Sequence, residues 1–119
     1  MIYDWFFNLS QAIECNVLCY DYAGYGRSEG RPSEQGCYED ISAAWRYVVH
    51  KKGIRPDRVV IYGRSLGSGP SCWLAAELGK QQQRHLPEEQ NRSKQTIRAP
   101  AGLLLQSGLM SVFRVALNF

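Results

Sequence analysis

The sequence predicts an α/β fold with about three parallel strands and flanking helices. Short apolar runs alternate along the chain with segments whose apolar residues recur at helical intervals. Strands that alternate with helices favour a parallel sheet with right-handed crossovers and helices on both faces. A third observation is a strand, a sharp glycine-rich turn and a helix in direct succession near residue 65. With 119 residues, 45% hydrophobic and 21% charged, the composition is globular and suits one domain.

The first elements are a helix and a short strand. Residues 5–14 carry four apolar side chains at a spacing that suits one helical face: Trp5, Phe6, Leu9 and Ile13. Residues 16–21 predict a short buried strand that ends at a turn signal. Residues 22–36 are glycine-rich and polar, which predicts a loop, and Ser33 is the expected N-cap of the next helix.

The helix that follows is expected over residues 38–50. It carries apolar residues at helical intervals, namely Tyr38, Ile41, Trp45 and Val48. Its acidic residues lie in the first turns and its basic residues in the last turn before Gly53, as the helix dipole favours. After a turn at residues 55–57, we expect a strand over 59–62 and a helix over 66–78.

The remaining chain is expected to hold one more strand. Residues 79–98 are polar and without periodicity, which predicts an inserted surface loop or a disordered segment. Residues 101–106 are a further strand candidate, and residues 109–119 form a largely apolar tail. Residues 1–119 are therefore expected to form one partial domain.

The turn between the strand at 59–62 and the helix at 66–78 has the chemistry of a nucleophile site. Gly63 and Gly67 flank Ser65 at the GxSxG spacing, which gives room for a tight turn that lifts the serine hydroxyl clear of the sheet. The positive end of the helix points at this serine, and the N–H of Leu66 is placed to be one donor to an oxyanion. Ser65 is the candidate nucleophile.

Two other glycine motifs do not fit the sequence. A phosphate-binding loop requires GxxxxGK[ST], and no lysine lies between Lys52 and Lys80. A dinucleotide fingerprint requires GxGxxG, and neither glycine cluster has that spacing. The remaining alternative is structural, a glycine-rich turn whose serine only caps the helix.

A second glycine cluster follows the strand expected at 16–21. It has the pattern DYxGxGxSxG over residues 21–30, in a loop at the carboxyl end of a parallel strand, where open α/β sheets bind ligands. Together, YDYAGYGRSEGRPSE, YEDISAAW and IYGRSLGSGP resemble the α/β-hydrolase superfamily, and within it the branch that includes protein depalmitoylases. APAGLLLQSGLMSVFRVALNF also fits that branch. The resemblance covers roughly residues 5–78 and 99–119.

The resemblance implies roles for several residues. Ser65 would be the nucleophile and the Leu66 N–H one oxyanion donor, and the loop around Tyr25, Gly26 and Ser28 would border the substrate pocket. No cofactor and no metal is implied. The substrate would be an acyl ester, thioester or amide, with a lipidated protein as an attractive class.

The general base and acid of such a site are missing from the sequence. The superfamily order is Ser, then Asp or Glu, then His. His50 precedes Ser65 and suits a helix cap, His85 lies in the polar insertion, and no aspartate follows Asp57. The chain is therefore expected to be an internal piece of a hydrolase, with little or no activity as written because a serine without its base is a weak nucleophile.

Two functions follow as hypotheses. The first is a serine hydrolase that works through an acyl-Ser65 intermediate, and the second is a non-catalytic binding or interaction module of the same fold. The dispersed cations, at net charge +3, argue against nucleic-acid binding. No apolar run reaches the ~20 residues that a membrane span needs, no signal peptide is apparent, and four unpaired cysteines favour a reducing, cytoplasmic location. Membrane association would depend on a region that the chain does not contain, and the oligomeric state is left open.

Overall fold

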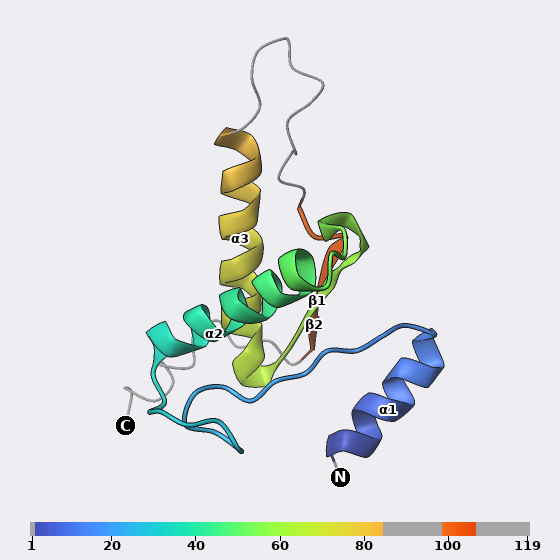
Figure 1. Cartoon of the computed structure of the whole chain (residues 1–119), viewed down its shortest axis with the longest axis vertical. Coiled ribbons are helices and arrows are strands. Elements are labelled where there is room, and N and C mark those ends of the chain that lie inside the picture. Colours follow the sequence, from blue (N-terminus) through green and yellow to red (C-terminus); the bar gives the residue numbers. More distant parts are fainter. Residues whose placement is uncertain (1, 85–98, 107–119) are drawn as a thin grey trace.

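The computed structural model describes residues 2–84 and 99–106, and its framework is two parallel strands with helices on both of their faces (Figure 1). Strand β1 covers Val60–Arg64 and strand β2 covers Gly102–Gln106. They pair in parallel with Val60 opposite Gly102 and Arg64 opposite Gln106. The Tyr62 hydroxyl also donates a hydrogen bond to the side-chain oxygen of Gln106, which fixes the same register.

The helices cover three stretches. Helix α1 spans Ile2–Ile13 and helix α3 spans Ser68–Arg84, both close to the expected positions at their amino ends. Helix α2 spans Glu34–Arg46 and continues as a π-helical turn, η1, over Tyr47–Lys51. Short 3₁₀ turns lie before and after β1, η2 at Pro56–Arg58 and η3 at Ser65–Gly67.

Local signals in the sequence explain the two ends of the helical segment that α2 and η1 form together. The Ser33 hydroxyl accepts a hydrogen bond from the Gly36 N–H at 2.9 Å, which confirms the predicted N-cap. After η1, which continues α2, Gly53 adopts a left-handed φ of +68°, a conformation that glycine adopts at little cost. The helical segment of α2 and η1 therefore begins after Ser33 and ends before Gly53.

The core forms where α2 and α3 pack on one face of β1. Its buried members come from all three elements: Ile41, Ile61, Leu74 and Leu78. Trp45, Trp73 and Ala75 pack against this cluster, and the rings of Tyr38 and Trp73 stack at 4.8 Å between α2 and α3. On the opposite face of β1, the Tyr62 ring lies 5.8 Å from the ring of Trp5 in α1.

The structure corrects the prediction of a strand at residues 16–21. These residues run as an extended segment with no strand pairing, so the described residues contain two parallel strands rather than about three. Leu18 is 52% exposed, so the segment is not buried either. An extended segment becomes a strand only when a neighbour supplies hydrogen bonds, and none of the described strands pairs with residues 16–21.

Helix α3 also differs from the expectation. It runs through Gly79 to Arg84, the first six residues of the segment predicted to be a polar loop. Lysine, glutamine and arginine are good helix formers, so this part of α3 needs no apolar periodicity. Residues 85–98, the rest of the predicted loop, and the apolar tail at 109–119 lie outside the described residues.

Candidate active site

Ser65 stands at the junction between β1 and α3, the strand–turn–helix order that the sequence predicts. It is exposed, and its φ of +49° lies in the left-handed region. For a residue with a side chain this conformation costs roughly 1–2 kcal/mol. Backbone strain of this kind persists only where the surrounding structure enforces it, and it gathers at functional sites. Among the described non-glycine residues Glu14 also has a left-handed φ, of 50°, but Ser65 combines this conformation with a hydroxyl at an exposed position after β1.

Ser68 closes the turn from the helix side. Its N–H and its hydroxyl both bond to the carbonyl oxygen of Ser65, the hydroxyl at 2.6 Å. The Ser68 side chain is only 2% exposed, which shields these bonds from water. Leu66 follows Ser65 in η3 and is half-buried. Because α3 begins at Ser68, the Leu66 backbone lies at the positive, amino-terminal end of that helix.

Gly63 has a clear steric reason to be glycine. A Cβ atom at this buried position would lie 2.7 Å from both the Gly67 carbonyl oxygen and the Ser71 hydroxyl, and 2.9 Å from the Ser68 Cα. Real Cβ atoms do not approach backbone that closely, so the end of β1 can meet the start of α3 only without a side chain here.

Gly67 differs from the sequence-based expectation. A Cβ atom there would meet only the Tyr22 hydroxyl oxygen, at 3.6 Å, which is an ordinary van der Waals distance. Among the described residues, the steric need for glycine in the GxSxG pattern is therefore confined to Gly63. The Tyr22 hydroxyl therefore lies near Gly67, and sequence reasoning missed this because an aromatic residue in a glycine-rich loop gives no sign of its neighbours.

The loop after residue 21 is fixed by its own hydrogen bonds. The Asp21 carboxylate accepts from the Arg27 N–H at 3.1 Å, and the Gly24 N–H donates to the Glu29 carbonyl at 3.1 Å. Gly26 has a left-handed φ of +54°, which strains any residue with a side chain, and a Cβ atom there would also clash with the Asp21 carboxylate. The predicted pocket residues Tyr25, Gly26 and Ser28 are exposed on this loop.

One carboxylate joins this loop to helix α2. The partly buried side chain of Asp40 accepts a hydrogen bond from the Ala23 N–H at 2.7 Å. Sequence reasoning counted Asp40 only as an acidic residue in the early turns of a helix. Its contact with Ala23, 17 residues away, places the start of the loop against α2.

We expect Asp40→Ala to lower the free energy of unfolding by about 1–3 kcal/mol, because it leaves the Ala23 N–H without its partly buried acceptor. Urea unfolding of the full-length protein measures the change. Asp40→Asn retains an acceptor oxygen, so its free energy of unfolding should fall by less. Glu39→Ala, at the exposed neighbouring residue, should keep a free energy of unfolding within about 0.5 kcal/mol of wild type. Equal losses for Asp40→Ala and Glu39→Ala would show that the contact does not hold the loop.

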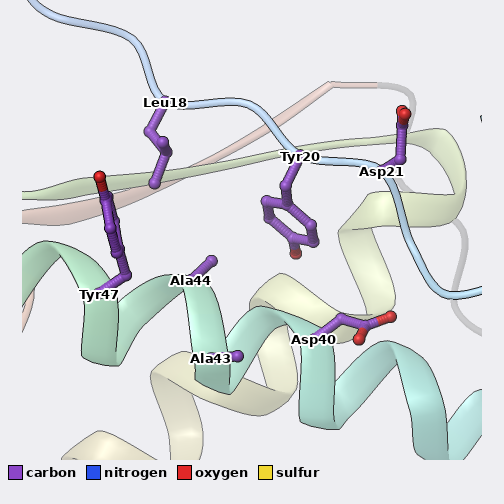
Figure 2. Close-up of a pocket in the computed structure, with 7 residues that line it drawn as sticks. All are labelled: Leu18, Tyr20, Asp21, Asp40, Ala43, Ala44 and Tyr47. Atoms are coloured by element: carbon purple, nitrogen blue, oxygen red, sulfur yellow. The ribbon is translucent and has the colours of Figure 1, made fainter. Parts of the chain in front are cut away.

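A pocket of about 290 Å³ lies between the extended segment and α2 (Figure 2). Figure 2 shows Leu18 and Tyr20 projecting from the segment toward the helix. The full lining is Leu18, Tyr20, Asp21, Asp40, Ala43, Ala44 and Tyr47. Neither Ser65 nor the predicted pocket residues Tyr25, Gly26 and Ser28 line it. This pocket is therefore not the acyl pocket that the sequence predicts beside Ser65.

The histidines give no base for Ser65 in the part of the chain that the structure describes. His50 is exposed in η1, which leads through η2 into the amino end of β1, whereas Ser65 follows the carboxyl end. His85 lies outside the described residues. Within residues 2–84 and 99–106, no group of His, Cys, Asp or Glu side chains is arranged to hold a metal ion, and all four cysteines are free thiols. No helix described here has the length and apolarity to cross a membrane.

Comparison with known proteins identifies the family to which this fold belongs. The model of the alpha/beta hydrolase fold matches residues 2–85, most of the chain, so the protein belongs to the alpha/beta hydrolase fold family. This confirms the family resemblance predicted from the two glycine motifs.

Similar relatives of the chain are alpha/beta hydrolase domain-containing proteins 17B and 17C. The chain is 51% identical over 71 residues to alpha/beta hydrolase domain-containing protein 17B of Xenopus laevis, and 49% identical over 71 residues to the human protein of that name. It is 42% identical over 71 residues to protein 17C of Mus musculus. These matches cover 60% of this chain but 25% of each 17B protein and 22% of 17C, so the chain spans about a quarter of the length of these relatives. No solved structure matches the chain.

Proposed function

We propose that the protein is a serine hydrolase that cleaves acyl esters or thioesters through an acyl-Ser65 intermediate. The observation that carries this proposal is the exposed, left-handed Ser65 in the strained turn between β1 and α3. A serine that only capped the helix would have no need of a backbone conformation that costs energy.

The turn suits two parts of acyl transfer. The Ser65 oxygen attacks the carbonyl carbon of the substrate, its proton passes to a general base, and the alcohol or thiol leaves with a proton. Water then cleaves the acyl-serine bond and releases the acid. The Leu66 N–H, at the positive end of α3, is the proposed donor to the oxyanion that forms in each step.

The proposed substrate class is an acyl chain on an alcohol or thiol, with lipidated proteins as the preferred candidates. This class comes from the resemblance of the glycine motifs to those of depalmitoylases. Residues on the loop that carries Tyr25, Gly26 and Ser28 are proposed to border the acyl site. Four free thiols favour a reducing compartment, so we propose a cytoplasmic location.

Hydrolysis of acyl thioesters and matched oxygen esters of increasing chain length tests the proposal. We expect saturable hydrolysis by the full-length protein with a rapid first turnover as acyl-Ser65 accumulates. Absence of hydrolysis from a sample shown to be folded would contradict the proposal and favour a non-catalytic binding module. The exposed position of His50, remote from the turn, is the observation that favours that second candidate.

A further inference from the structure

The carbonyl group of Ser65 is held by two hydrogen bonds from one residue, Ser68. The Ser68 N–H donates to the carbonyl oxygen where η3 passes into α3, and the Ser68 hydroxyl donates to the same oxygen at 2.6 Å. Ser68 is only 2% exposed, and a hydrogen bond in such surroundings is stronger than it is in water. The two bonds together fix the direction in which the Ser65 carbonyl points.

The direction of this carbonyl also sets the direction of the Leu66 N–H. The two groups belong to one planar peptide unit, and no peptide bond in the described residues is cis. In a planar trans unit the N–H points opposite to the C=O. Because the Ser65 carbonyl points to Ser68, the Leu66 N–H points away from Ser68. It lies at the start of the helical segment, where N–H groups have no acceptor within the helix.

Ser68 is itself held in place between β1 and α3. Gly63 in β1 passes so close that a Cβ atom on it would lie 2.9 Å from the Ser68 Cα. Ser68 is the first residue of α3, so its backbone can shift only if the strand and the helix move apart. The donor of the two hydrogen bonds is therefore a fixed point against which the Ser65 carbonyl is oriented.

The backbone of Ser65 needs such support because it is strained. Its φ of +49° is unfavourable for a residue with a side chain, and such a conformation persists only where the surrounding structure holds it. With the Ser68 N–H bond alone, the peptide unit between Ser65 and Leu66 could pivot about one contact. A rotation that relieved the strain would also turn the Leu66 N–H. The second bond, from the Ser68 hydroxyl, restricts this rotation.

We propose that Ser68 is a positioning residue, whose hydroxyl holds the peptide unit between Ser65 and Leu66 so that the Leu66 N–H faces the oxyanion during acyl transfer. The inference rests on the proposed function for its catalytic part, because the Leu66 N–H is the oxyanion donor proposed there. The Ser68 hydroxyl acts through the Ser65 carbonyl and does not touch the substrate, since Ser68 is buried.

The test compares Ser68→Ala with Ser42→Ala in the full-length protein. Each variant removes one hydroxyl that donates to a backbone carbonyl, at 2.6 Å in Ser68 and at 2.7 Å in Ser42 on α2. Complete removal of an oxyanion donor lowers kcat by about 10²–10³, so a misdirected donor should cost less. We expect Ser68→Ala to lower kcat about tenfold with KM within twofold of wild type, because the oxyanion forms only in the transition state. Ser42→Ala should keep both constants within about twofold.

A conservative variant separates the role of the hydroxyl from its effect on stability. Ser68→Thr retains a hydroxyl on the same carbon atom, so we expect its kcat to stay within about threefold of wild type. Urea unfolding should show similar losses of stability in Ser68→Ala and Ser42→Ala, because each loses one hydrogen bond of the same kind. Equal kcat values for wild type and Ser68→Ala, or equal losses of kcat in Ser68→Ala and Ser42→Ala, would overturn the proposal. If Ser68→Thr does not fold, the two alanine variants decide alone.

Hydrogen exchange distinguishes a failure of this inference from a failure of the proposed function. We expect the amides of residues 66–68 to exchange severalfold faster in Ser68→Ala than in wild type or Ser42→Ala, because the turn loses a hydrogen bond. If wild type hydrolyses no ester but this difference appears, the hydrolase proposal fails and the Ser68 hydroxyl still holds the turn. If wild type is active and Ser68→Ala changes neither exchange nor kcat, the positioning role of Ser68 is wrong.

Discussion

Replacing Ser65 with alanine is expected to reduce turnover of an acyl thioester on the order of 10⁶-fold, to the level of the uncatalysed reaction plus residual binding effects. The reason is that the acyl intermediate forms on the Ser65 oxygen and no other hydroxyl occupies the exposed, left-handed position at the end of β1 in residues 2–84 and 99–106. Ser68, the nearest serine in sequence, is buried and donates its proton to the Ser65 carbonyl.

The matched control for this experiment is Ser42→Ala. Ser42 lies on α2, where its partly buried hydroxyl donates to the Tyr38 carbonyl at 2.7 Å. Its loss should cost no more than about 1.5 kcal/mol of stability and leave turnover within twofold. Steady-state hydrolysis by purified full-length variants measures both effects. A Ser65→Ala protein with more than a tenth of wild-type turnover would rule out Ser65 as the nucleophile.

The second large effect is expected from Gly63→Ala. The added Cβ would lie 2.7 Å from the Gly67 carbonyl and 2.9 Å from the Ser68 Cα, and backbone atoms cannot move aside without opening the turn. We expect a loss of about 1–3 kcal/mol in the free energy of unfolding, together with loss of activity because Ser65 shifts with the turn.

Gly79→Ala is the matched control for Gly63→Ala. Nothing lies within 4 Å of a Cβ at Gly79, which sits inside α3, so alanine should stabilise the protein by about 0.5–1 kcal/mol. Urea unfolding compares the two variants on the same protein. Effects of the same sign and size at both positions would show that the close approach at Gly63 does not exist.

Local signals made much of this structure predictable from the sequence. Ser33 marks the start of α2 and Gly53 follows the end of η1, because a cap needs a side-chain oxygen at one end and a left-handed residue at the other. The turn at Ser65 was predictable because GxSxG after an apolar strand is typical of a tight strand-to-helix turn, and the close backbone approach at Gly63 leaves no room for a side chain. Both predictions depend on neighbours within a few residues.

Features that depend on distant residues were not predictable in this way. Residues 16–21 have the composition of a strand, but composition cannot say whether a partner strand lies beside them. The polar end of α3 lacked apolar periodicity, so its helix could be predicted only from propensity. The hydrogen bond from Ala23 to Asp40 and the proximity of Tyr22 to Gly67 join residues far apart in the chain, and no local pattern encodes them.

The measurement that tests the central claim most directly is covalent labelling of the folded, full-length protein with a fluorophosphonate, followed by peptide mapping. Our account predicts a single phosphonyl adduct on the Ser65 oxygen that disappears in Ser65→Ala and when the protein is unfolded before labelling. No adduct on a folded sample, or an adduct on another serine with Ser65 unmodified, would contradict it.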